Sequence, residues 1–323
     1  YLFWLVLYNT FYTCISVPHL ALIPEMTNSD KERTELTSYK IITLVLAALL
    51  GTSVHGVLIQ VIENQRLAYF ISASIFSVIF IFPPIITAIV CKEIAGMKRV
   101  KQKEQPSFVQ GMKIAIRNRP FVLLCGSFVG AYMGTQFLVA HFYLYVQYVL
   151  DEEDQIIYLI FLLQCVIAIS VLIWQKLSRV LEKKIIFYAG SACCITCAVW
   201  LIFVQQVWWL YPGCVILGVG IGAIFLIPFA MVPEIIDLDE KAIGCRREGV
   251  YYGLFVFLQK MATSVGLAIG SIALGAAGLE TGTTDADATT AVIIVLRVMA
   301  GVLPAILFTL SLIPMFFYPY GKR

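Results

Sequence analysis

Charged side chains are scarce in this sequence. Asp, Glu, Lys and Arg make up 13% of its 323 residues, and hydrophobic residues make up 60%. A soluble domain carries about 25% charged residues, so the composition excludes a soluble enzyme and a disordered chain. The net charge of +3 is too small to indicate a nucleic-acid partner. We therefore divide the chain by the roughly 20 residues that one membrane crossing needs.

Enzyme motifs are also missing. The chain contains no HExxH, P-loop or GxSxG pattern, so we predict no enzyme activity, no catalytic residue, no metal site and no cofactor. Gly218, Gly220 and Gly222 form a GxGxG pattern, but no strand precedes it, and close helix packing is the plainer explanation. The cysteines lie mostly in apolar stretches, which favours buried side chains rather than a disulfide framework.

Long apolar runs dominate what remains. Each is long enough to cross a bilayer as a helix, so the sequence predicts an all-α integral membrane protein. The nine predicted spans are Tyr1–Ile23, Ile41–Ile62, Tyr69–Val90, Phe121–Val149, Ile156–Trp174, Ile185–Val204, Leu210–Val232, Val250–Gly278 and Ala291–Tyr318.

Basic residues are distributed unevenly between the loops. Alternate loops hold nearly all of the Lys and Arg outside the spans, whereas the other loops hold only Arg66 and acidic groups such as Asp151 to Asp154. Basic loops stay on the cytoplasmic side. We therefore predict a multi-pass membrane protein whose C-terminus is cytoplasmic and whose first visible span enters from outside.

Lys260 is the most informative polar residue. It lies about ten residues into the eighth span, so roughly 15 Å deep at 1.5 Å per residue, too deep to reach water along the lipid face. All twenty Asp and Glu lie in loops or at span ends. The partner of Lys260 is therefore outside this chain, is a substrate anion, or is not needed because the lysine is neutral. A structural lysine bonded to helix carbonyls is the alternative to a transport role.

Other polar side chains form stripes on the first, fourth and eighth spans. Such faces suit ligands with hydroxyl or headgroup atoms, although hydrogen bonds between helices explain them as well. His19 would titrate near neutral pH. The candidate residues for substrate binding or coupling are Lys260, Gln136, Tyr132, Tyr143, Asn9, Ser16, His19, Tyr252 and Thr263.

Loop motifs occur in a recognisable order. They are Pro24-Glu25-Met26-Thr27, Asn118-Arg119-Pro120-Phe121, Pro233-Glu234-Ile235-Ile236-Asp237 and Arg246-Arg247-Glu248-Gly249. With them the chain resembles the glycoside–pentoside–hexuronide:cation symporter family of the major facilitator superfamily. That family includes melibiose permease and the sodium-dependent lysophosphatidylcholine symporters.

The resemblance implies a twelve-helix bundle of two halves, of which about nine helices, the fourth to twelfth, are visible in an N-terminally truncated chain. Residues 1–90 would be part of the N-terminal half, 91–119 the cytoplasmic central loop, and 120–323 the C-terminal six-helix half. Lys260 would match the membrane lysine that serves substrate binding and coupling. The residues implied at the inner gate are Lys40, Asp237, Arg246 and Arg247.

The chain also departs from the melibiose-type pattern. Ser16 stands where an acidic residue serves sugar and cation, Leu20 replaces an aromatic residue, and Phe255-Val256 replaces a polar pair. We predict a cation-coupled symporter that moves a sugar or glycoside-like solute by alternating access, with Na⁺ or H⁺ as the coupling ion and the bilayer as its setting. The alternatives are a lysophospholipid symporter and a non-transporting receptor or scaffold of transporter ancestry.

Overall fold

A computed structural model describes residues 2–27, 29–62, 64–90, 108–243, 247–279 and 290–319. Across these ranges the regular structure is helical, with no strand. Nine of the helical segments in the described ranges are long and apolar enough to cross a membrane. The predicted fold class, an all-α integral membrane protein, is confirmed.

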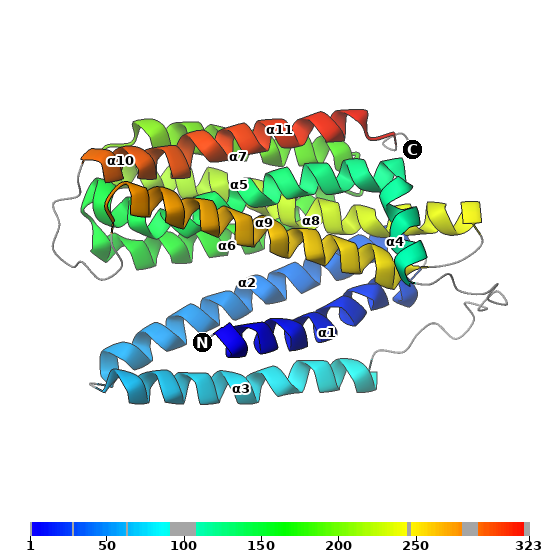
Figure 1. Ribbon diagram of the computed structural model, residues 1–323, viewed down its shortest axis with the longest axis horizontal. Coiled ribbons are helices and arrows are strands. Elements are labelled where there is room, and N and C mark those ends of the chain that lie inside the picture. Colours follow the sequence, from blue (N-terminus) through cyan, green and yellow to red (C-terminus); the bar gives the residue numbers. More distant parts are fainter. Residues whose placement is uncertain are drawn as a thin grey trace. The chain divides into compact units, whose positions relative to one another are not determined.

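The helices follow the chain in the order drawn in Figure 1. Short 3₁₀ segments precede α6 and α8, and a π-helical segment, η3 (Val298–Val302), joins the last two helices into one span. The helices are α1 (Leu2–Met26), α2 (Asp30–Val61), α3 (Gln65–Val90), α4 (Phe108–Arg117), α5 (Arg119–Leu150), α6 (Ile156–Leu177), α7 (Lys183–Phe203), α8 (Leu210–Ile243), α9 (Glu248–Ala276), α10 (Thr290–Arg297) and α11 (Leu303–Phe317).

Each predicted span corresponds to one candidate membrane span of the structure, but several helices extend past the apolar runs. Helix α2 begins at Asp30 instead of Ile41, with Asp30 and Glu32 in its first turn, where carboxylates interact favourably with the helix dipole. Helix α8 continues to Ile243, beyond the predicted Val232. Hydropathy locates the part of a helix inside the lipid, whereas capping and charge decide where the helix ends.

Helix α4 was not predicted. It lies within residues 91–119, which we expected to be loop, and its ten residues are too few to span a bilayer. Its small residues Gly111 and Ala115 are buried, and Gly111 lies against Val250 of α9. Its basic residues Lys113 and Arg117 are exposed. A helix of ten residues is marginally stable by itself, and contacts with α5 and α9 hold α4 in place.

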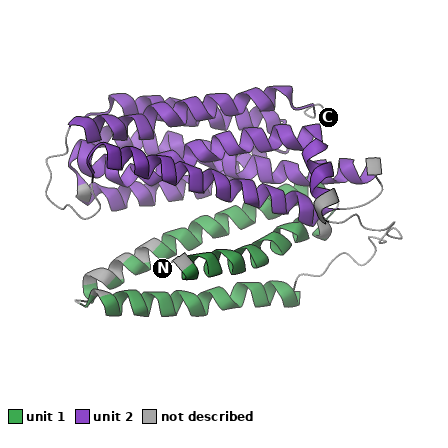
Figure 2. Ribbon diagram, in the orientation of Figure 1, with its two compact units in different colours: residues 1–105 green, residues 106–323 purple. Residues whose placement is uncertain are grey.

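The chain divides into two compact units, residues 1–105 and 106–323, coloured separately in Figure 2. In unit 1, α2 packs against both α1 and α3. Unit 2 contains α4 to α11 and most of the buried side chains. The division falls within the predicted central loop.

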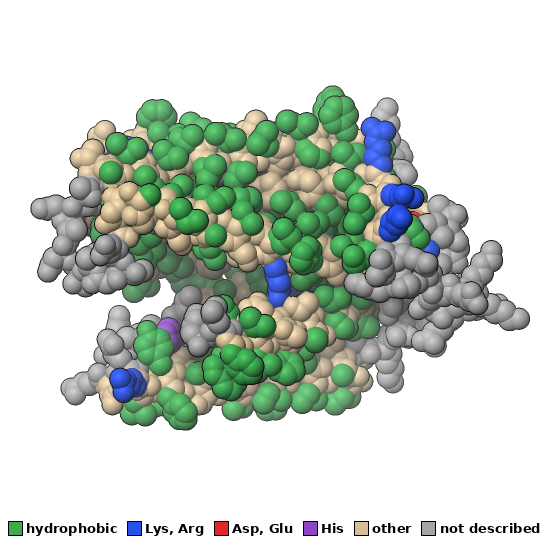
Figure 3. All heavy atoms as spheres, viewed as in Figure 1, with side chains coloured by type: hydrophobic (Ala, Val, Ile, Leu, Met, Phe, Trp, Pro, Cys, Tyr) green, Lys and Arg blue, Asp and Glu red, His purple; other side chains and the backbone are tan. Residues whose placement is uncertain are grey.

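Both units carry large apolar side chains on their surfaces, which Figure 3 shows as widespread green. Phe80 of α3 is 60% exposed and Phe316 of α11 is 71% exposed. A soluble protein rarely exposes apolar surface on this scale. These surfaces are suited to contact lipid chains.

Small residues allow the helices of unit 2 to approach closely. A side chain at Gly220 or Gly222 of α8 would overlap Cys194 of α7 or Ser170 of α6. This confirms that the GxGxG pattern serves helix packing. On the other side of the unit, Gly126, Gly130 and Gly134 of α5 lie against α11, so α5 packs between α11, α8 and α9.

Candidate functional site

Lys260 lies in the middle of a membrane span. It is the thirteenth residue of α9, which runs from Glu248 to Ala276, so its Cα is about 18 Å from the start of the helix at 1.5 Å per residue. The hydrocarbon core is roughly 30 Å thick. The side chain is half-buried, and it interacts with another group of this chain. The ammonium is therefore placed at mid-membrane depth with a partner available within the chain.

One turn further along α9, a polar contact joins two helices. The side-chain amide of Gln136 on α5 donates a hydrogen bond to Thr263 Oγ1 at 3.1 Å, and Thr263 in turn donates to the carbonyl of Gln259 at 3.2 Å. Both side chains are half-buried. Two of the predicted site residues are thus brought together, one turn of helix from Lys260.

An aromatic cluster adjoins these polar groups. Phe128 of α5 stacks on Phe255 of α9 with ring centroids 4.2 Å apart, and both rings meet Phe229 of α8 edge-on at 5.6 and 5.0 Å. Tyr132 contacts Phe128 at 5.2 Å and Phe225 at 5.9 Å. The cluster's core is buried, whereas Tyr132 and Phe225 are half-exposed at its edge. We call Lys260, Gln136, Thr263, Tyr132 and Phe225 the mid-span site.

Two predicted candidates of unit 2, Tyr143 and Tyr252, lie outside the mid-span site. Tyr143 is 48% exposed, further along α5 than Gln136. Tyr252 is 1% exposed, so it does not share the partly open face with Lys260, although the two residues are only about 80° apart around the helix. Tight packing of the first turns of α9 buries Tyr252.

The candidates of the first span belong to unit 1. Asn9 donates its amide to the carbonyl of Leu5 at 3.0 Å, and Ser16 donates to that of Thr13 at 3.5 Å. His19 is exposed and interacts electrostatically with Lys40 of α2, which is half-buried. The bonds of Asn9 and Ser16 to their own helix satisfy part of their polar capacity locally.

At one end of unit 2, a polar network joins the starts of α5 and α9 to the end of α8. Asn118 donates to the hydroxyl of Tyr251 at 3.0 Å, Tyr251 hydrogen-bonds to Asp239, and Arg247 interacts electrostatically with both. Asp239 and Tyr251 are not among the residues predicted from the sequence. The acidic run after Pro233 was a signal, but it pointed to Asp237, which is half-buried.

Of the residues expected at the inner gate, Arg247 is placed in this network by its interactions with Asp239 and Tyr251. Arg246 lies outside the described residues, and Lys40 belongs to unit 1.

Basic residues gather at the same end. Lys183 at the start of α7 forms an ion pair with Glu234 of α8 at 2.5 Å and donates to the carbonyl of Ala230 at 2.9 Å. Lys184 donates to the carbonyl of Phe316 at 2.9 Å. Figure 3 shows Lys and Arg side chains at the end of unit 2 where the chain terminates. We call this the basic end.

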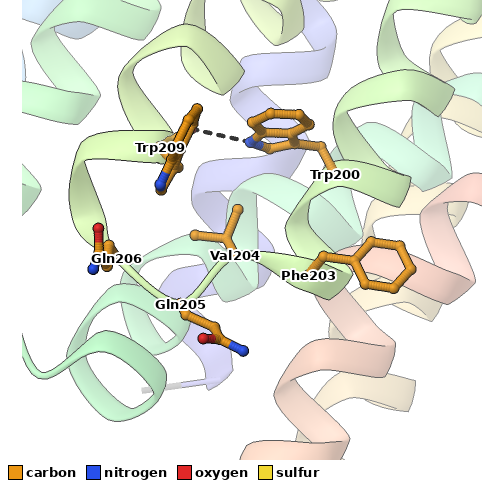
Figure 4. Close-up of a pocket in the computed structure, with 6 residues that line it drawn as sticks. All are labelled: Trp200, Phe203, Val204, Gln205, Gln206 and Trp209. Atoms are coloured by element: carbon orange, nitrogen blue, oxygen red, sulfur yellow. Dashed lines mark hydrogen bonds between the residues drawn. The ribbon is translucent and has the colours of Figure 1, made fainter.

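A pocket of about 350 Å³ lies at the other end of α7. Figure 4 shows the six residues that line it, around the turn from α7 into α8. The lining residues are Trp200, Phe203, Val204, Gln205, Gln206 and Trp209. None of these six residues is a predicted candidate.

The described helices define a multi-span membrane protein with a polar site at mid-membrane depth, an arrangement typical of secondary transporters. The chain belongs to the family described as MFS/sugar transport protein, whose model matches residues 1–322. This confirms the predicted family and the predicted class, a membrane transporter rather than an enzyme.

Three curated relatives carry transporter names. The chain is 23% identical to a zebrafish (Danio rerio) sodium-dependent lysophosphatidylcholine symporter, with 100% of this chain and 67% of the relative covered. It is 25% identical to an uncharacterized symporter of Synechocystis, with 84% of this chain and 64% of the relative covered. It is 22% identical to a sphingosine-1-phosphate transporter of Xenopus tropicalis, with 97% of this chain and 68% of the relative covered. The chain thus spans about two thirds of the length of these relatives.

Proposed function

We propose that this protein is a cation-coupled symporter that moves a lysophospholipid-like amphiphile by alternating access. The observation that carries the proposal is the mid-span site, where Lys260 lies one helical turn from Thr263, which accepts a hydrogen bond from Gln136. Tyr132, one turn before Gln136 on α5, forms an aromatic edge with Phe225. An amphiphile presents a charged headgroup next to an apolar chain, and this site offers partners for both. The names of the zebrafish and Xenopus relatives point to the same chemical class.

The headgroup would bind at Lys260. A phosphate accepts strong hydrogen bonds from an ammonium. Thr263 is one helical turn from Lys260 on α9, and Gln136 of α5 donates a hydrogen bond to Thr263. Lys260 would exchange its present partner for the phosphate when the cation binds, because a ligand shifts the equilibrium only through unequal affinity for two states. Sodium is the proposed cation, following the name of the zebrafish relative.

The apolar chain would follow the aromatic cluster. Phe255 and Val256, which replace the polar pair of the melibiose-type pattern, are 0% and 4% exposed. Phe255 is part of the stack with Phe128 and Phe229. Apolar side chains at these two positions offer no hydrogen bonds to sugar hydroxyls. Phe255 stacks on Phe128, which in turn contacts the half-exposed ring of Tyr132.

A sugar or glycoside is the second candidate substrate. Tyr132 and Gln136 are residue types that bind hydroxylated ligands, and the family description includes sugar transport. The two candidates differ in what they require of Phe225. Replacing this half-exposed ring would weaken transport of an amphiphile, whereas a sugar would depend more on the amide of Gln136.

We also propose an orientation and a gate. The basic end would be cytoplasmic, in line with the positive-inside rule, and the C-terminus would lie on that side. Arg247 and Asp239 would form part of the inner gate with Asp237 and Arg246 of the same unit. Residues 120–323 would act as the C-terminal half of the bundle.

The decisive test replaces Lys260 in the full-length protein. Liposomes containing wild type, Lys260→Met or Lys260→Arg are given a sodium gradient and radiolabelled lysophosphatidylcholine, then labelled melibiose. A hydrogen bond to a charged group contributes about 1.5–3 kcal/mol, so Lys260→Met should lower uptake by roughly ten- to a hundredfold. Lys260→Arg should retain part of the activity.

Lys241→Met is the matched control, because Lys241 is an exposed lysine at a helix end. Its uptake should equal that of wild type. Normal gradient-driven uptake by Lys260→Met would disprove the role of Lys260. Binding without uptake of either solute by the wild-type protein would favour a receptor or scaffold instead.

A further inference from the structure

The pocket at the end of α7 lies where the chain leaves the membrane. One candidate span ends at Phe203 and the next begins at Val207, so the pocket-lining residues occupy the boundary between hydrocarbon and water. The start of α7 lies at the basic end, where Lys184 bonds to the last turn of α11. The pocket is therefore on the opposite face of the bundle from the C-terminus of α11.

Two indole rings form one side of the pocket. The ring centroids of Trp200 and Trp209 are 5.8 Å apart, with the ring planes at 62°. Trp200 Nε1 donates a hydrogen bond to the carbonyl of Trp209 at 3.1 Å, the dashed line in Figure 4. The two side chains are 40% and 52% exposed. This bond fixes the corner between the rings and leaves their faces accessible.

An aromatic corner of this kind suits a quaternary ammonium group. Indole rings attract cations through their negative faces, and aromatic cages recognise choline and methylated lysine in this way. Phe203, 73% exposed, adds a third ring to the lining. The methyl groups of choline would gain apolar contacts that a hydrated ammonium does not make.

The charges around the pocket favour a zwitterion over a simple cation. None of the six lining residues is charged, and Gln205 and Gln206 supply amide donors. Arg297 of α10 donates to the carbonyls of Ile202 at 2.9 Å and Val204 at 3.5 Å. The guanidinium therefore lies against the backbone of Ile202 and Val204, which leads into the pocket wall. That positive charge would attract a phosphate placed beside the choline.

We propose that this pocket binds the headgroup of a phosphatidylcholine molecule of the surrounding bilayer. The choline would lie in the Trp200–Trp209 corner, and the phosphate would lie towards Gln205, Gln206 and Arg297. The acyl chains would remain in the lipid, beside the exposed apolar surface of α7. The site is separate from the mid-span site and does not depend on which solute is transported.

Native mass spectrometry of the purified full-length protein tests the proposal. The protein is titrated with phosphatidylcholine, phosphatidylethanolamine and phosphatidylglycerol of identical acyl chains. Removing two cation–π interactions at once corresponds to roughly a tenfold change in affinity. Wild type should bind phosphatidylcholine about tenfold more tightly than the other two lipids, and Trp200→Leu/Trp209→Leu should abolish this preference.

Three variants make the result specific. Trp208→Leu is the matched control, because Trp208 is a neighbouring exposed indole that stacks on Tyr211 and does not line the pocket. It should keep the preference, as should Lys260→Met, whose change is at the mid-span site. If the double variant fails to fold, Trp209→Leu alone should reduce the preference several-fold, since Trp209 is half-exposed.

Equal binding of all three lipids by wild type would overturn the proposal. So would a preference that survives Trp200→Leu/Trp209→Leu, or one that Trp208→Leu removes to the same extent, because each shows a non-specific lipid contact. Loss of the preference in Lys260→Met would place the lipid at the mid-span site instead and would also overturn it.

Discussion

At the scale of single residues, Gly270 shows how closely α5 and α9 approach. A Cβ atom on Gly270 would overlap the imidazole of His141, which is 4% exposed and hydrogen-bonds through Nδ1 to the carbonyl of Phe137 at 2.8 Å. The same packing positions Gln136 against Thr263. A glycine here therefore supports the mid-span site without contributing a side chain to it.

We predict that Gly270→Ala destabilises the protein. Overpacking a well-packed interface costs about 1–3 kcal/mol, which exceeds the gain of up to ~1 kcal/mol expected for alanine over glycine in a helix. Thermal unfolding in detergent measures the effect. His141→Ala combined with Gly270→Ala should recover part of the loss, because it removes the atoms that the new methyl group meets.

Gly275→Ala provides the control on the same helix. Nothing lies within 4 Å of a Cβ at Gly275, so this variant should be as stable as wild type or slightly more stable. If Gly270→Ala unfolds at the same temperature as Gly275→Ala, α5 and α9 do not approach each other as closely at Gly270 as the structure shows.

At the scale of elements, the end of α7 is held by side chains from two other helices. Tyr145 of α5 donates to the carbonyl of Leu201 at 2.7 Å, and Arg297 of α10 donates to that of Ile202. The last carbonyls of a helix have no partner within the helix. These contacts supply partners at the point where α7 turns into the pocket.

Tyr145→Phe should therefore loosen the end of α7. The hydroxyl is buried, and an unpaired buried acceptor costs about 1–3 kcal/mol, so the unfolding temperature should fall. Tyr143→Phe is the control, because Tyr143 is exposed on the same helix. Hydrogen exchange at residues 201–204 should rise in Tyr145→Phe alone, and equal exchange in both variants would contradict the capping role.

At the scale of the whole molecule, the distribution of charge predicts sidedness. Lys183, Lys184 and Arg247 lie at the basic end of unit 2, whereas Asp151 and Glu152 follow the end of α5 at the other. We expect Glu152→Cys to react with an impermeant maleimide on intact cells. Lys241→Cys should react only after permeabilisation, in a background with the native cysteines replaced.

Both positions are exposed in the structure, so a lack of reaction from one side reports the membrane and not burial. Labelling of Lys241→Cys on intact cells, with Glu152→Cys protected, would reverse the proposed orientation. Labelling of both on intact cells would contradict the odd number of spans, α6, α7 and α8, that separates the two positions.

The nine spans could be predicted because each is encoded locally. An apolar run of sufficient length must form a helix in lipid, where every backbone group needs an internal partner. Lys260 was also identifiable, since a lysine in such a run is costly. The start of α2 at Asp30 and the short helix α4 were missed, because first-turn charges and contacts with neighbouring helices decide them.

The sequence by itself determined that this is a multi-span membrane protein with a deep lysine, and its ordered loop motifs indicated a symporter family. Only the tertiary structure decided which polar residues meet. Gln136 contacts Thr263, Tyr252 is buried, and Trp200 forms a corner with Trp209. These outcomes depend on how each helix is rotated and how its ridges pack into its neighbours, and local hydropathy does not encode that geometry.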